Sequence, residues 1–329
     1  ACGGGGWASL RAARPPSALA PPPVLAFVPT PTTDAPPGAA AAAGGVAPRV
    51  LHVSRAPGRD GQVAVASASS ADAALLDLRC ERVHQAGEVG VCLEAIGPQS
   101  YSGFAFDGAH RKTFAFGVPG IPSRARAAPD GARVAWTAFV TGHSYLGAVG
   151  FSTETSVVDL RARHVTNLER MELRRNGERW APVDLNYWGV TFAADSEQFY
   201  ATVQSGGVAQ LVTGDLRAQR LDTLGVIGEC PSLSPSGRRL AFKRRVEAEG
   251  RTQFRVVVRE LDTGAETLLA GAGEVDDQVE WLDEDTLLFG VSSGGLRERR
   301  SSRIMAVDTA ADAAPALLLA DAESPAVLR

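Results

Sequence analysis

The sequence has few of the residues that chemistry on a metal or a phosphate needs. It contains five histidines, four cysteines and only two lysines, Lys112 and Lys243. No His-Glu-x-x-His, phosphate-loop or dinucleotide-binding pattern is present, which removes the usual zinc hydrolase and nucleotide-binding classes. The formal net charge is -4, which argues against binding nucleic acid through a broad basic surface. No apolar run approaches the roughly 20 residues of a membrane-spanning helix.

The first 48 residues have almost no charge and little that could form a core. They hold ten of the 20 prolines, and their only charged residues are Arg11, Arg14 and Asp34. A segment of this composition buries too little surface to offset the entropy of ordering it. We therefore expect residues 1–48 to be a disordered tether. Cys2 either carries a lipid at a processed N-terminus, which would anchor the chain to a membrane, or is an ordinary free cysteine.

From residue 49 onward helical periodicity nearly disappears, and a short repeated hairpin takes its place. Each copy predicts a strand, a tight turn and a second strand with an aromatic residue near its end. Pro-Asp-Gly and Pro-Ser-Gly supply the fixed φ and the positive φ that such a turn uses. Four copies align without gaps: Ala128–Trp136, Ala193–Ala201, Ser234–Phe242 and Trp281–Phe289.

The hairpins belong to a longer repeat. An apolar strand ending near an aspartate follows each one, and a final short strand closes the unit. The period of about 40–55 residues is that of a propeller blade. We predict an all-β chain whose residues 49–329 form a six-bladed β-propeller of four-stranded antiparallel blades. Five blades, or a two-sheet sandwich, are the alternatives. The predicted blades are 49–78, 79–118, 121–170, 184–225, 228–271 and 275–322, with an Asn-Gly hairpin inserted at 171–183.

Two of these units resemble a known repeat. Ser234–Phe242, followed by Val258–Glu266, is similar to the WD40-like (PD40-type) repeat of TolB-type propellers, with its Ser-Pro-Asp-Gly and Asp-Leu-x-Thr-Gly turns. The resemblance extends over roughly residues 120–310. It implies a six-bladed propeller, export to the cell envelope of a high-GC bacterium and a binding role without catalysis. The mixed α/β domain that precedes the propeller in TolB has no counterpart in residues 1–48.

Two cysteines flank a predicted hairpin whose turn falls at Gly87. Cys80 and Cys92 would lie across its two strands, within reach of a disulfide. The bridge would stabilise the fold by about 3 kcal/mol in the chain-entropy model and would support export. The alternative is a pair of buried thiols in a cytosolic protein. Cys230 has no evident partner.

Propeller topology predicts where a binding site lies. Loops between blades and loops between strands 2 and 3 share one face, while the hairpin turns lie on the other. The interblade loops carry arginine, aromatic and acidic residues, so we expect ligand binding at this mouth of the channel. The candidate residues are Arg124, Arg126, His143, Tyr145, Asn186, Tyr187, Trp188, Glu229, Asp276, Asp277 and Gln278.

Each candidate also has a purely structural explanation. Arg124 and Arg126 alternate on one strand, so both could bind an anion in the channel. They could instead pair with Asp276 and Asp277 and hold blades together. Trp188 and the adjacent Tyr187 either stack against a ligand or pack between blades. The acidic stretch from residue 276 lacks the spacing of a calcium loop, so no metal site is predicted.

The sequence therefore favours a non-catalytic binding module. We expect it to bind a protein, peptide or glycan of the cell envelope, without a cofactor, nucleic acid or membrane-spanning segment, and as a monomer. The alternative is a propeller hydrolase or lyase that uses His143 with Asp276 or Asp277 at the channel mouth. Gly142–Gly147 does not form a nucleophile elbow, because its second glycine comes one position late. Fold alone does not decide between binding and catalysis.

Overall fold

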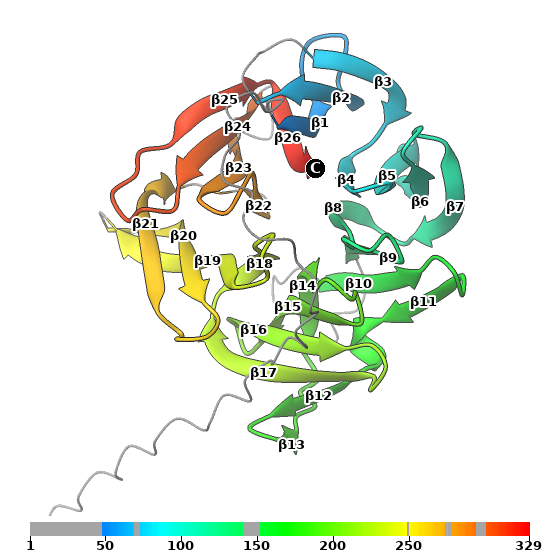
Figure 1. Ribbon diagram of the computed structural model, residues 1–329. Coiled ribbons are helices and arrows are strands. Elements are labelled where there is room, and N and C mark those ends of the chain that lie inside the picture. The colour runs from blue at the N-terminus through cyan, green and yellow to red at the C-terminus, as the bar shows by residue number, and fades with distance from the viewer. Residues whose placement is uncertain are drawn as a thin grey trace, which may run out of the picture. The chain divides into compact units, whose positions relative to one another are not determined.

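The predicted six-bladed propeller is confirmed by the structure, a computed structural model. It describes residues 48–68, 73–140, 152–248, 250–273, 275, 278–293 and 301–329. These residues form 26 strands and one 3-10 turn, η1 (Leu168–Arg170). The strands make six sheets around a common axis (Figure 1). The predicted tether lies outside the described residues, apart from Pro48. No helix in the described part of the chain has the length and apolarity to cross a membrane.

The blades are numbered in chain order, and each is given from its innermost strand outward. Blade 1 contains β26 (Ala322–Leu328), β1 (Arg49–Ser54), β2 (Gln62–Ser67) and β3 (Ala73–Arg79). Blade 2 contains β4 (Arg82–Ala86), β5 (Val89–Gly97), β6 (Ser100–Asp107) and β7 (Lys112–Val118). Blade 3 contains β8 (Ile121–Ala127), β9 (Arg133–Val140), β10 (Ser152–Asp159) and β11 (His164–Asn167).

The second half of the ring follows the same plan. Blade 4 contains β14 (Asn186–Phe192), β15 (Gln198–Ser205), β16 (Val208–Asp215) and β17 (Arg220–Ile227). Blade 5 contains β18 (Glu229–Leu233), β19 (Arg239–Ala248), β20 (Arg251–Glu260) and β21 (Glu266–Gly273). Blade 6 contains β22 (Glu280–Trp281), β23 (Thr286–Ser293), β24 (Ser301–Asp308) and β25 (Ala316–Ala320).

The repeated turn between strands 1 and 2 has the same hydrogen bond in three blades. The N–H of Gly131, Ser196 and Gly237 donates to the carbonyl three residues earlier, at 3.0, 3.1 and 2.8 Å. All three residues have positive φ, between 50° and 71°. Glycine adopts this conformation without a Cβ clash. The repeated sequence motif therefore corresponds to the same turn conformation in these three blades.

The ring is closed by the C-terminal strand, which is where the structure differs from the predicted blades. β26 pairs antiparallel with β1, so the first and last strands of the propeller share blade 1. Residues 49–78 therefore supply only three of the four strands of that blade. Figure 1 shows the C-terminus at the inner edge of blade 1, beside β1. The two ends of the propeller thus hold each other through main-chain hydrogen bonds.

The predicted inserted hairpin is present at the outer edge of blade 4. β12 (Glu172–Arg175) and β13 (Glu178–Arg179) are joined by Asn176 and Gly177, whose φ values are 54° and 82°. Positive φ at both central residues is the type I′ geometry that Asn-Gly favours. β12 pairs in parallel with β17, and the buried Leu173 packs into the core between blades 3 and 4.

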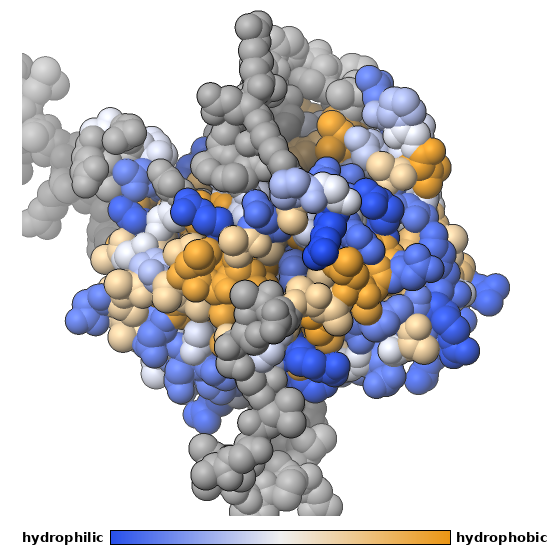
Figure 2. Space-filling model, turned by 90° about the horizontal axis from the view of Figure 1, so that it is seen from above, coloured by the Kyte–Doolittle hydropathy of each residue, from blue (hydrophilic) through white to orange (hydrophobic). Residues whose placement is uncertain are grey.

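The hydrophobic core consists of six clusters, one between each pair of neighbouring blades. Trp281, Phe104 and Phe242 are among the largest fully buried side chains. Burial of apolar residues is less complete at the outer edge of the ring. Figure 2 looks onto blades 1 and 6, where apolar residues gather on the surface; Leu75 on β3 and Leu317 on β25 are exposed. The apolar side chains that stabilise the ring thus pack mainly between neighbouring sheets, whereas the axis of the ring is lined by polar residues.

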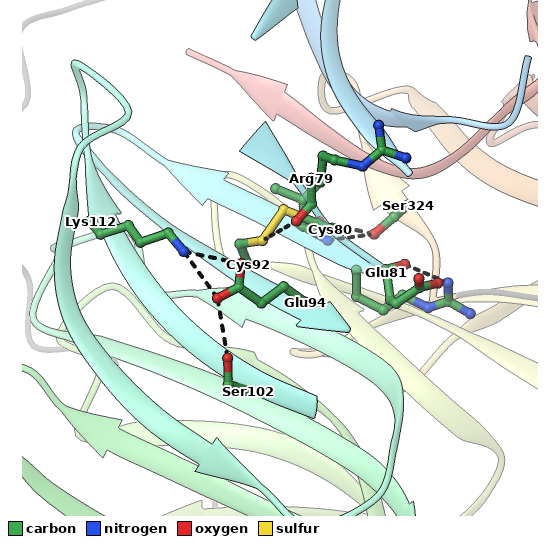
Figure 3. The surroundings of a disulfide bond; sticks show 10 residues. Arg79, Cys80, Glu81, Cys92, Glu94, Ser102, Lys112 and Ser324 are labelled. Atoms are coloured by element: carbon green, nitrogen blue, oxygen red, sulfur yellow. Dashed lines mark hydrogen bonds and ion pairs between the residues drawn. A yellow bond between two sulfur atoms is a disulfide. The ribbon is translucent and has the colours of Figure 1, made fainter. Parts of the chain in front are cut away.

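The predicted disulfide is confirmed. Cys80, just before β4, and Cys92 on β5 are bridged with a Cα–Cα distance of 5.5 Å. Figure 3 shows the bridge beside an ion pair on the same blade, in which Lys112 Nζ lies 3.0 Å from both carboxylate oxygens of Glu94. Cys230 is a free, buried thiol.

Candidate functional site

The candidate site is the central channel, which is lined by the innermost strand of each blade (Figure 1). The chain enters each inner strand from the loop between blades. The first residues of these strands therefore lie at the face that carries those loops, which we call the mouth face. The opposite face, with the hairpin turns, is the turn face. Residues two apart on a strand point the same way, so the channel is lined by two layers of side chains.

The layer nearer the mouth, the upper layer, contains Arg82, Arg124, Gln278 and Ser324. The lower layer contains His84, Arg126, Ser232 and Glu280.

An ion pair crosses the channel in the lower layer. Arg126 on β8 donates from Nη1 to Glu280 Oε2 on β22, and these strands belong to blades 3 and 6, on opposite sides of the ring. Arg126 Nη2 also donates to the carbonyl of Val279 at 3.2 Å and to Ser232 Oγ at 3.4 Å. Arg126 and Glu280 are 7% and 5% exposed. Because these side chains span the axis, they form a floor beneath the upper layer.

His84 completes this floor. Its Nδ1 accepts a hydrogen bond from the Ala127 N–H at 3.1 Å, and its Nε2 lies 3.4 Å from Glu280 Oε2. The same Nε2 lies 2.8 Å from Arg126 Nη1, so His84 contacts both charged residues of the floor. Burial, together with the charge of Arg126, lowers the pKa of His84. Burial alone would raise the pKa of Glu280, but attraction to Arg126 and the other cations outweighs it and lowers that pKa to about 2.

Two guanidinium groups from neighbouring blades meet in the upper layer. Arg82 Nε and Arg124 Nη1 each donate to the carbonyl of Ser123 at 2.8 Å. Arg82 Nη1 also donates to Glu323 at 2.7 Å. Arg124 Nη2 reaches towards blade 5 and lies 3.9 Å from Cys230 Sγ. Guanidinium donors fixed in this way can bind a carboxylate or another anion at the mouth.

Gln278 connects three blades in the same layer. Its Nε2 donates to the carbonyls of Val190 on β14 and Pro231 on β18, at 3.1 and 2.5 Å. The structure thus brings three predicted residues, Arg124, Arg126 and Gln278, together in the channel. Arg126 pairs with Glu280, a residue that had not been proposed as its partner.

The predicted aromatic residues Tyr187 and Trp188 are both buried. Tyr187 and Trp188 are 1% and 6% exposed, and Tyr187 lies in the core between blades 3 and 4. The carbonyl of Tyr187 accepts a hydrogen bond from Thr153 Oγ1 at 2.9 Å. Burial raises the pKa of the Tyr187 hydroxyl. Tyr187 is therefore part of the packing between blades 3 and 4.

Asn186 and Glu229 open their inner strands at the mouth face. Asn186 Oδ1 accepts from the Thr153 N–H at 2.9 Å, which joins blade 4 to blade 3. Glu229 is 8% exposed, and its Oε1 lies 3.6 Å from Arg245 Nε. His143, Tyr145, Asp276 and Asp277 lie outside the described residues, so the geometry of the predicted enzyme site is not defined.

Sequence reasoning missed Glu280 and His84 as channel residues. In blades 3, 4 and 5 the hairpin turn opens at Ala128, Ala193 and Ser234. The residues two positions earlier are Arg126, Thr191 and Ser232. In blade 6 the turn opens at Leu282 and is one residue shorter than in the other three copies. The gap-free alignment was therefore displaced by one position in this blade. Counting back two residues from Leu282 would have found Glu280.

In the channel, the ion pair of Arg126 and Glu280 lies below the guanidinium groups of Arg82 and Arg124. Among the residues that the structure describes, no group of three or more histidine, cysteine, aspartate or glutamate side chains is placed to hold a metal ion. The floor carboxylate and guanidinium are engaged with each other, while the upper guanidinium groups lie nearer the mouth.

No protein-family model matches the sequence, and no curated protein does. The structure is similar to that of TolB from Acinetobacter baumannii, with a TM-score of 0.60, 16% identity, and coverage of 85% of this chain and 66% of that one. It is also similar to a putative TolB from Agrobacterium tumefaciens, with a TM-score of 0.51, 12% identity, and coverage of 84% and 90%. A chain of a nidogen/laminin complex gives a TM-score of 0.51 at 10% identity, with coverage of 85% and 98%. At these identities the comparisons establish a TolB-like propeller fold.

Proposed function

We propose that this chain is a non-catalytic binding propeller of the bacterial cell envelope, which binds a protein or peptide at its mouth face. The observation that carries the proposal is the ion pair that spans the channel beneath the guanidinium groups of the upper layer. Arg126 and Glu280 span the axis, so a ligand would enter from the mouth and stop at the level of Arg82 and Arg124. A blind, polar mouth suits the recognition of a projecting chain segment.

Two features support the envelope location. The Cys80–Cys92 disulfide suits an oxidising compartment, because cytosolic thiols are normally kept reduced. The fold is also shared with TolB structures. A tether in residues 1–48 would hold the propeller near the membrane.

Arg124 provides the test of the binding face. Immobilised protein is incubated with solubilised envelope extract of the source bacterium, and captured proteins are identified by mass spectrometry. Arg124→Glu reverses a charge at the mouth and should abolish capture. Arg111→Glu is the matched control, because the exposed Arg111 lies in the turn between strands 3 and 4 of blade 2, on the turn face, where it pairs with Asp107. Equal capture by both variants would place the interface elsewhere.

The enzyme alternative has its own test. Purified protein is assayed against peptide and glycan substrates, with and without calcium. Turnover that disappears in His143→Ala would replace the binding proposal with a catalytic one, and we expect no turnover.

A further inference from the structure

The chain contains three asparagines, Asn167, Asn176 and Asn186, and the structure places them in different surroundings. The side-chain amides of two of them are fixed by hydrogen bonds. Asn167 Oδ1 accepts a hydrogen bond from the Glu169 N–H at 2.8 Å, at the start of η1. Asn186 Oδ1 accepts from the Thr153 N–H at 2.9 Å, between blades 3 and 4. Asn176, in contrast, is exposed in the turn of the inserted hairpin.

The residues that follow the three asparagines differ in the same way. Leu168 and Tyr187 follow the first and the third asparagine, and both are buried, at 0% and 1% exposure. Gly177 follows Asn176 with a φ of 82°, and a Cβ at this position would meet no atom within 4 Å. Gly177 thus has no side chain to hinder an attack by its own main-chain nitrogen, and the space around its Cα is open.

The inserted hairpin is held together weakly. Its ladder pairs Arg174 with Arg179 and Arg175 with Glu178, so the two turn residues lie outside the ladder. Like charges opposite each other, as in the first of these pairs, are unfavourable. β12 and β13 lie at the outer edge of the ring (Figure 1). A two-stranded hairpin is marginally stable by itself, so this one can open locally while the propeller stays folded.

An exposed asparagine followed by glycine in such a turn can react with its own main chain. We propose that Asn176 deamidates in the folded protein, with the main-chain nitrogen of Gly177 as the nucleophile. When the turn opens, this nitrogen loses its proton and attacks Cγ of Asn176. The Cγ–Nδ2 bond breaks, ammonia leaves, and a cyclic succinimide remains. Water then opens the ring at either carbonyl and gives aspartate or isoaspartate. The inference does not depend on the proposed function.

Both products change the hairpin. Aspartate adds a negative charge next to Arg175, whose Cζ lies 4.9 Å from the centroid of the Trp180 ring. Isoaspartate also adds a methylene group to the main chain, so that the two-residue type I′ turn no longer fits its strands. Leu173 remains in the core, and β12 remains paired with β17. We therefore expect the change to stay within the turn and β13.

The test compares the three asparagines within one molecule. Purified protein is incubated in mildly alkaline buffer, with and without denaturing guanidinium chloride, and peptide mapping by mass spectrometry follows deamidation at each site. The denatured protein gives the rate that the local sequence sets. In the folded protein Asn176 should react within about tenfold of that rate, because opening so small a hairpin costs little. Asn167 and Asn186 should be protected far more strongly, because they react only when larger parts of the fold open.

A pair of variants tests the role of hairpin opening. Trp180→Leu removes the ring that Arg175 contacts and should speed deamidation of Asn176 in the folded protein about two- to fivefold, the range of an exposed cation–π contact. Phe114→Leu is the matched control, because Arg163 makes the equivalent contact with that ring, at 5.8 Å, between blades 2 and 3. This variant should leave the rate at Asn176 unchanged.

Asn186 reports whether a variant has unfolded as a whole, because it would then react at its rate in guanidinium chloride; the wild-type comparison decides in that case. Three results would overturn the inference. The first is protection of Asn176 in the folded protein as strong as that of Asn186. The second is deamidation confined to another asparagine. The third is a rate at Asn176 that both variants change equally.

Discussion

Glu323, on the last strand, accepts a hydrogen bond from Arg82 at 2.7 Å, although 241 residues separate them. The same carboxylate oxygen accepts from Arg55 at 2.5 Å, and the other oxygen accepts from Ser302 at 3.2 Å. One buried carboxylate therefore joins the C-terminal strand to blades 1, 2 and 6. The main-chain pairing of β26 with β1 is reinforced by charge at the point where the ring closes.

Removing this charge should destabilise the ring closure. Glu323→Gln removes the carboxylate that pairs with Arg82 and one of the three that pair with Arg55. Breaking a buried ion pair on one side costs about 3 kcal/mol or more. The free energy of unfolding, measured in urea, should fall by that amount. Glu266 is the matched control, since it also bridges two arginines, Arg244 and Arg259, but at the more exposed rim. Glu266→Gln should change stability by less than about 1 kcal/mol, and an equal loss in both variants would contradict the closure role of Glu323.

The channel floor should show strong coupling between its two charged residues. Arg126→Met or Glu280→Met alone leaves a buried charge uncompensated, and each should cost about 3–5 kcal/mol. The double variant removes both charges and should be at least about 2 kcal/mol more stable than the sum of the single effects predicts. A double-mutant cycle in guanidinium chloride measures this term. Additive losses would mean that the two side chains do not interact across the channel.

Acid should weaken the fold before the floor carboxylate titrates. Burial lowers the pKa of His84 and of His52, whereas both approach 6.5 when unfolded. Below that pH the unfolded chain binds protons that the native state excludes. Stability therefore falls as pH drops from 7.5 to 5.5, by up to about 1.4 kcal/mol per pH unit for each histidine. Glu280, with a pKa of about 2, remains ionised throughout this window.

His84→Gln isolates one part of this slope. In this variant only His52 should still contribute to the loss of stability in acid. The measurement is the urea unfolding midpoint as a function of pH. A slope unchanged by the substitution would mean that His84 takes up its proton over the same pH range in the folded and the unfolded protein.

Reduction of the disulfide should lower stability by about 3 kcal/mol in the chain-entropy model. The bridge closes a loop with a sequence separation of 12. The measurement is the guanidinium unfolding midpoint with and without dithiothreitol. The Cys80→Ala/Cys92→Ala variant should start from the lower midpoint and show no response to reductant. A wild-type midpoint that reductant leaves unchanged would contradict a stabilising bridge.

Local features of this protein could be predicted from its sequence. The turns at Gly131 and Gly237 and the Asn176-Gly177 hairpin follow from backbone preferences of a few adjacent residues, so they appear wherever those residues occur. The Cys80–Cys92 bridge spans a single hairpin and depends on the same short-range geometry. Repetition of one hairpin at the blade period was enough to predict an all-β propeller.

The channel could not be predicted in the same way, because its contacts depend on how the whole ring closes. Arg126 meets Glu280 only because six blades place blade 3 opposite blade 6, and because the turn after Glu280 is one residue shorter. Glu323 reaches Arg82 only once β26 has returned to blade 1. Lys243 on β19 is only 3% exposed, and this burial likewise comes from packing that the pattern of its own strand does not reveal. Sequence by itself determined the repeating unit, and tertiary closure decided which charged residues face one another.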